Sequence, residues 1–116
     1  MNSPQDKLAA RIRPALADHH VREVAMFGGL SFMVDDRIVV SAGRDGDLLV
    51  RIDPARHGEL LGVAGAREAV MGADRPMGDR WIRVDHAGIA TPESLDFWIQ
   101  VALDHHSAAN DDRHRG

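Results

Sequence analysis

The run MFGGLSFMVDD, residues 26–36, places two adjacent glycines, Gly28 and Gly29, between apolar residues that favour strands. A glycine inside a strand loses side-chain packing and backbone entropy, so a pair of them marks a tight turn, a bulge or a close approach of two backbones. Two interpretations follow. The pair is either a turn between two short strands or a bulge that bends one longer strand over residues 24–34. We favour the bulge, because residues 24–27 are short for a separate strand.

From Val24 to Ile52, apolar residues alternate with others, which is typical of strands with one buried face. Turn-forming clusters at residues 35–36 and 44–47 close two hairpins in this region. The pattern therefore predicts three antiparallel strands. A weaker pattern predicts another strand over residues 68–72, and Ile82 and Val84 alternate clearly within a last strand over residues 81–85.

Three helices are predicted around these strands. Ser3-Pro4 is typical of a helix start, and the apolar face that follows continues to Leu16, so we expect a bend at the internal proline, Pro14. Asp53-Pro54 begins a short second helix that ends near Gly62. The third helix begins at Thr91-Pro92. Its apolar stripe consists of Leu95, Trp98, Ile99, Ala102 and Leu103.

Composition limits the functions to consider. At 116 residues the chain forms one domain, which we place at residues 1–106, followed by a disordered tail at 107–116 without apolar periodicity. The absence of cysteine fits a cytoplasmic location, and no apolar run approaches the ~20 residues that cross a membrane. A net charge of −4 argues against a general nucleic-acid surface. A local cluster of positive charge is still possible among the following arginines: Arg51, Arg56, Arg67, Arg75, Arg80 and Arg83.

No residue pattern predicts catalysis, a metal or a cofactor. The pairs His19-His20 and His105-His106 are neighbours on a helix, so their rings point about 100° apart and do not meet at one ion. His106 with Asn110 or Asp111 would share an ion only if the last helix continued into the tail. The candidate nucleophiles fit structural positions in strands or at a helix start. They are Ser31, Ser41, Thr91 and Ser94.

The MFGG motif, with an aromatic residue and a Val-Asp turn behind it, resembles the N-terminal domain of the TfoX/Sxy competence-regulator family. The resemblance extends over residues 7–106. Beyond the motif it includes residues 49–51, residues 75–78 and the closing helix as far as Trp98. It implies an α+β fold of order α-β3-α-β2-α, in which helices cover a curved antiparallel sheet with one bent strand at the glycine pair. Longer members carry a second, DNA-binding-like C-terminal domain that is not found in these residues, so we expect a single-domain member. The motif residues with a structural role are Met26, Phe27, Gly28 and Gly29.

The resemblance implies a non-enzymatic protein-interaction or regulatory module, related to transcription or competence, with an unidentified protein partner. The alternative is a small-ligand binder or enzyme with a pocket beside Gly28-Gly29, in which Arg51 anchors an anion. Trp81 alternates onto the face opposite Ile82 and Val84, and with Leu49 it would be costly in water. We therefore expect a homodimer through exposed sheet. The competing possibility is a monomer in which the second helix or residues 63–80 cover that face.

Overall fold

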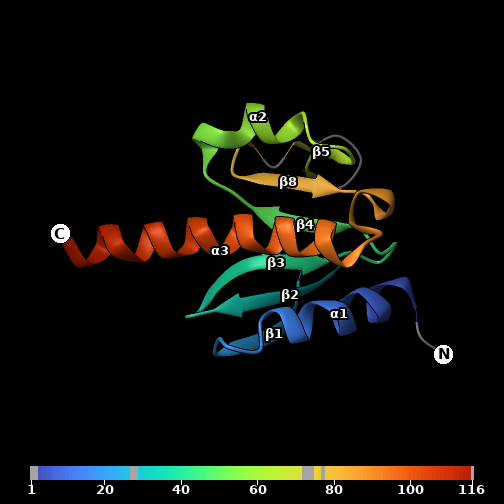
Figure 1. Cartoon of the computed structure of the whole chain (residues 1–116), viewed down its shortest axis with the longest axis horizontal. Helices are drawn as coiled ribbons and strands as arrows, with labels where there is room; N and C mark the ends of the chain where they lie inside the picture. The colour runs from blue at the N-terminus through green and yellow to red at the C-terminus, as the bar shows by residue number, and fades with distance from the viewer. Residues whose placement is uncertain (1–2, 27–28, 72–74, 77, 116) are drawn as a thin grey trace.

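The computed structural model describes residues 3–26, 29–71, 75–76 and 78–115, and it has an α+β fold, as predicted. Six strands form one open antiparallel sheet in the order β1-β2-β3-β4-β8-β5, and β6 with β7 forms a separate small hairpin (Figure 1). The elements are α1 (Pro4–Ala15), β1 (Val21–Met26), β2 (Gly29–Val34), β3 (Arg37–Ala42), β4 (Leu48–Arg51), the 3-10 turn η1 (Pro54–Arg56), α2 (His57–Leu61), β5 (Ala66–Glu68), β6 (Val70–Met71), β7 (Arg75–Pro76), β8 (Trp81–Val84), the 3-10 turn η2 (His86–Ile89) and α3 (Pro92–Arg115).

The favoured interpretation of one bent strand over residues 24–34 is wrong, because β1 ends at Met26 and a separate strand, β2, begins at Gly29; Phe27 and Gly28 lie outside the described residues. Strands β1 and β2 pair antiparallel from Val21 opposite Val34 to Met26 opposite Gly29. The first strand begins three residues earlier than its apolar pattern indicates, which makes it long enough to pair by itself. Four strands therefore precede α2, where three were predicted. The register shift of this part of the sheet lies instead between Phe32 and Met33, where β2 pairs with β3.

Helix α1 ends where a bend was expected. Its start is a capping box, in which the Ser3 side chain accepts from the Asp6 N–H and the Asp6 carboxylate accepts from the Ser3 N–H. The helix stops at Ala15, one residue after Pro14, because proline lacks a backbone donor and crowds the preceding turn. Leu16 is the C-cap and is still buried, so the apolar face continues without further helix.

The core lies between the sheet and the two longer helices. Figure 1 shows α1 and α3 on the same side of the sheet, with α3 crossing β3 and β4 and α1 lying over β2 and β3. Helix α3 continues to Arg115, into the segment for which the sequence predicts disorder. The largest fully buried side chains of this core are Trp98, Phe32, Ile12, Leu16, Leu48, Ile52, Leu60, Ile82 and Ile89.

The turn between β2 and β3 consists of two aspartates in the left-handed region, Asp35 at φ 52° and Asp36 at φ 65°. Two successive positive φ values are typical of a type I′ hairpin turn, in which the second central residue is usually glycine. We expect Asp36→Gly to raise the free energy of unfolding by roughly 0.5–1 kcal/mol, because glycine adopts this conformation without a Cβ penalty. Urea unfolding measures the change. An equal or lower stability of the variant would contradict the expectation.

Candidate functional site

Gly29 is a point of close approach between two strands. It is the buried first residue of β2, and a Cβ at this position would lie 2.7 Å from the Ala42 carbonyl oxygen and 3.0 Å from Ser41 Oγ. Its backbone is not in the left-handed region, so the space between β2 and β3, and not a special φ, requires the glycine. Phe27 and Gly28 lie outside the described residues, as does the side chain of Met26. Of the family motif, the structure therefore accounts for Gly29.

The structure does not bring Gly29 and Arg51 into one pocket. In the sheet, Leu30 lies opposite Ala42 and Ala42 lies opposite Leu48. Gly29 is thus beyond the Leu48 end of β4, and Arg51 is at the other end of that strand. The two residues are separated by two strand positions across the sheet and by about 13 Å along it, at about 3.3 Å per residue. Of the described residues, Gly29 and Arg51 therefore do not line a common pocket, and Gly28 lies outside the described part.

Arg51 instead lines a small hollow between the sheet and α3. The hollow has a volume of about 10 Å³, enough for one water-sized group. Arg80 lies next to it, because the Ile52 N–H donates to the Arg80 carbonyl oxygen at 2.8 Å. The walls come from β3, β4 and α3 and consist of Arg37, Ile38, Val39, Arg51, Ala102, His105 and His106.

Positive charge accumulates around this hollow. Partial burial lowers the pKa of Arg51, and the charges of Arg37 and Arg80 lower it further. Partial burial and the Arg51 charge also lower the pKa of His105, and Arg80 and His106 act in the same direction, whereas Asp53 opposes them. Among the described residues, Arg37, Arg51 and Arg80 have no hydrogen bond or ion pair from their side chains. The structure thus forms the local arginine cluster that the sequence left open, with members that only partly overlap the predicted set.

The lowered pKa of His105 should make the fold less stable in acid. The unfolded chain has the ordinary value of 6.5 for this group, so it binds more protons than the folded chain as the pH falls below 6.5. We expect the free energy of unfolding to decrease from that pH down to the lowered folded pKa, and His105→Gln to remove this part of the decrease. Urea unfolding at several pH values measures it. An unchanged pH profile in the variant would contradict this expectation.

The second candidate surface is the face of β4 and β8 that carries Leu49 and Trp81. Leu49 lies opposite Arg83 and Arg51 lies opposite Trp81, so Leu49 and Trp81 are diagonal neighbours on one face. Both side chains are partly exposed. Val70 of the β6 hairpin lines a hollow of about 140 Å³ with Leu49, but Val70 is itself 41% exposed. Val70 therefore covers this face only in part, and we call it the Leu49–Trp81 face.

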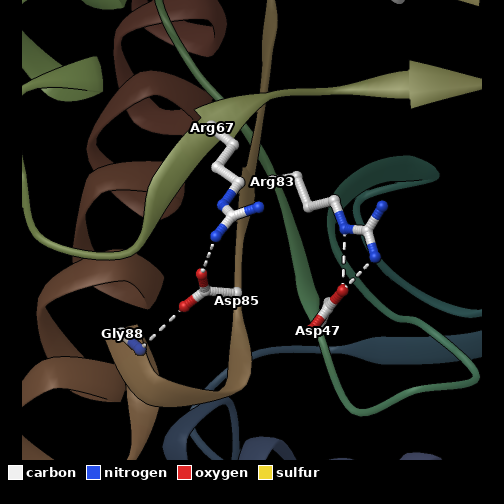
Figure 2. Close-up of polar contacts among 5 residues, drawn as sticks. All are labelled: Asp47, Arg67, Arg83, Asp85 and Gly88. Carbon is white, nitrogen blue, oxygen red and sulfur yellow. Dashed lines mark hydrogen bonds and ion pairs between the residues drawn. The ribbon is translucent and has the colours of Figure 1, made fainter.

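Ion pairs hold the surroundings of this face in place. Arg83 Nε donates to Asp47 Oδ2 at 2.7 Å, which joins β8 to the turn before β4 (Figure 2). Arg67 pairs with Asp85 at 3.1 Å, and Asp85 also accepts from the Gly88 N–H at 3.3 Å (Figure 2). These contacts connect β5, β8 and the η2 turn. They orient charged side chains around the apolar pair, as at the rim of a protein interface.

Sequence reasoning missed an exposed aromatic residue on α3. Phe97 is 42% exposed and contacts Trp98 edge to face, with the ring centroids 5.2 Å apart. It lies at one side of an apolar groove of about 440 Å³ that also involves Ala64 and Ala87. The available signal was its position, because Phe97 falls outside the apolar stripe that faces the core.

The residues considered for chemistry have structural partners. Ser31 and Ser41 are buried opposite each other in β2 and β3, with 3.2 Å between their hydroxyl oxygens. Thr91 and Ser94 bond to each other at the start of α3. Within the described residues, no three His, Asp or Glu side chains converge on a common point. Helix α3 does continue into the tail, but the side chains of Asn110 and Asp111 lie outside the described set.

The comparisons with known proteins agree with the fold. The family model described as the TfoX N-terminal domain matches residues 14–106, most of the chain. A search of curated proteins finds no match. In the described part of the chain, no helix combines the length and the apolar character needed to cross a membrane.

Proposed function

Because the chain belongs to the TfoX N-terminal domain family, and this membership supports a regulatory or competence-related role, we propose that it acts in the cytoplasm by binding other proteins. In this proposal it is not an enzyme. The hydroxyl groups considered as nucleophiles are engaged in strand pairing and helix capping, and none of them contacts a base among the described residues. A protein-binding domain needs a surface rather than an assembled set of reacting groups. We propose the Leu49–Trp81 face of the sheet for this role.

The observation that carries the proposal is the Leu49–Trp81 face. Helices α1 and α3 lie on the opposite side of the sheet, against β2, β3 and β4. Leu49 and Trp81 remain partly exposed, and tryptophan contributes a large apolar area when an interface forms. A two-fold axis through this face would bury both copies of the pair at once, and two-fold dimers are the commonest soluble oligomers. We therefore propose a homodimer as one assembly of the module.

The dimer is tested by light scattering at micromolar concentration. We expect twice the chain mass for the wild type and a shift toward the monomer for Trp81→Ala, because the variant removes the largest apolar group of the face. Phe97→Ser is the matched control, since it removes an exposed aromatic residue from α3 and should leave the mass unchanged. A monomeric wild type would reject the dimer. If Phe97→Ser dissociates the dimer and Trp81→Ala does not, the interface lies instead at the apolar groove beside Phe97.

Binding to other proteins is tested separately. Pull-down from the native cell, followed by mass spectrometry, should recover the same partner with the wild type in repeated experiments. Trp81→Ala should reduce that recovery if the partner uses the Leu49–Trp81 face. Reproducible absence of any partner at native expression would contradict the interaction module, whatever the mass in solution.

A further inference from the structure

Three arginines gather where the sheet meets the second half of α3. Arg37 at the start of β3 and Arg51 at the end of β4 line the same hollow. Arg80 joins them through its backbone bond to Ile52, and its charge acts on both Arg51 and His105. We call Arg37, Arg51, Arg80 and His105 the arginine site. The side chains of Arg37, Arg51 and His105 thus line one hollow from β3, β4 and α3, and the backbone of Arg80 lies beside the end of β4, although these residues are far apart in the sequence.

We propose that the arginine site binds the phosphate group of a small molecule. Guanidinium groups donate two hydrogen bonds in a fixed fork that matches phosphate oxygens, and an imidazole N–H adds another donor. The hollow of about 10 Å³ accommodates a single oxygen atom, and the remaining oxygens would lie at its mouth between the arginines. Ile38, Val39 and Ala102 line the hollow as well. Their apolar surface limits water there and strengthens the ionic contacts.

No carboxylate of the described residues forms an ion pair with an arginine of the site, although the Asp53 charge acts on His105. Asp35 contacts His106 Nε2 at 3.0 Å, and Asp53 accepts from the Ala55 N–H at 2.9 Å. Within the described residues, neither carboxylate contacts an arginine of the site. Burial lowers the pKa of Arg51 most and the charges of Arg37 and Arg80 lower it further, so all three disfavour its charged form and carry a cost in free energy. A bound anion would offset this cost.

A single phosphate group fits these observations better than a nucleic acid. Binding to a duplex depends on many phosphate contacts along an extended basic surface. This chain has a net charge of −4, and the arginine site is one local cluster beside a hollow. A phosphate dianion also interacts more strongly with three cations than a carboxylate with one charge does. The hollow and the Leu49–Trp81 face are neighbours, because Arg51 lies opposite Trp81, and they are tested with different variants and different measurements.

Isothermal titration with phosphate and pyrophosphate, at constant ionic strength, tests the site. We expect saturable binding by the wild type and at least about tenfold weaker binding by Arg51→Gln, because one charged hydrogen-bond donor is lost. Arg22→Gln is the matched control, since Arg22 is an exposed arginine of β1 that does not line the hollow. It should bind like the wild type. Acetate should bind more weakly than phosphate.

Three results would overturn the proposal. The first is no saturable phosphate binding by the wild type, and the second is an equal loss in Arg51→Gln and Arg22→Gln. The third is Arg51-dependent binding of duplex DNA that is tighter than phosphate binding, which would assign the cluster to a nucleic acid. Misfolding is distinguished by melting without ligand. Arg51→Gln removes a repelled, partly buried charge, so it should melt at or above the wild-type temperature.

The pH dependence of anion binding identifies the part played by His105. Sulfate is the probe, because its charge does not change between neutral and mildly acidic pH. His105 is surrounded by Arg51, Arg80, Asp53 and His106, and an anion in the hollow would favour its protonated form. Sulfate affinity should therefore rise as the pH falls toward the lowered pKa of His105, and His105→Gln should flatten the rise. A rise of the same size in the variant would exclude His105 from the site.

Discussion

Replacing Gly65 by alanine should lower the free energy of unfolding by about 2–5 kcal/mol. Two effects add up: alanine is strained in a left-handed backbone conformation, and its Cβ would clash with a neighbouring backbone. Gly65 lies between α2 and β5 at φ +85°, where an L side chain is strained. A Cβ there would also lie 2.5 Å from the Cα of Gly88, in the η2 turn. Neither backbone can withdraw easily, since the Asp85 N–H donates to the Gly65 carbonyl at 3.0 Å and the Asp85 carboxylate accepts from Gly88 (Figure 2).

Gly78→Ala separates the two contributions. Gly78 has nearly the same backbone angle, φ +88°, but a Cβ there would meet no atom within 4 Å. Its loss of stability should therefore reflect the backbone angle alone, about 1 kcal/mol. Gly65→Ala with Gly88→Ala should cost less than the sum of the single variants, because the first substitution already separates the two backbones. Urea unfolding of the three single variants, the double variant and the wild type measures these free energies. Equal losses for Gly65→Ala and Gly78→Ala would show that the Gly65–Gly88 contact carries no stability.

Replacing Gly29 by valine should lower the free energy of unfolding by about 1–3 kcal/mol through overpacking. The atom in the way is the Ala42 carbonyl oxygen, 2.7 Å from the position of a Cβ, and it belongs to the backbone of β3. That strand is held between β2 and β4, so it cannot give way without loss of pairing on one side. Thermal and urea unfolding should show the loss in the isolated protein, with no partner present.

Gly58→Ala is the control for this substitution. Gly58 lies within α2, and a Cβ there would meet no atom within 4 Å. Alanine should raise the stability by roughly 0.5–1 kcal/mol, because glycine is the poorer helix former. The two variants are thus expected to have opposite signs. If Gly29→Val melts with the wild type while the dimer or a partner is lost, Gly29 belongs to a contact surface and its structural role is wrong.

The candidate site shows how far sequence patterns reach. The alternation of Ile82 and Val84 placed Trp81 on the opposite face of its strand, and the structure has Trp81 partly exposed there. The arginine site could not be assembled in the same way. Arg37 and Arg80 belong to different segments of the chain, and only the order β3-β4-β8 brings both of them beside Arg51. Strand order depends on which hydrophobic faces pack together, and this is not encoded in the local spacing of residues.

By itself, the sequence determined the elements whose causes are local. The Ser3 capping box, the proline starts of the helices and the apolar stripe from Leu95 to Ala102 depend on residues within a few positions of each other. The tertiary structure alone decided what Gly29 and Gly65 are for, since each approaches a backbone from another part of the chain. It also decided that two strands, and not one bent strand, flank this motif, because the choice depended on whether residues 21–26 pair with β2. Local preferences were compatible with either form, and the hydrogen bonds between the two strands selected one.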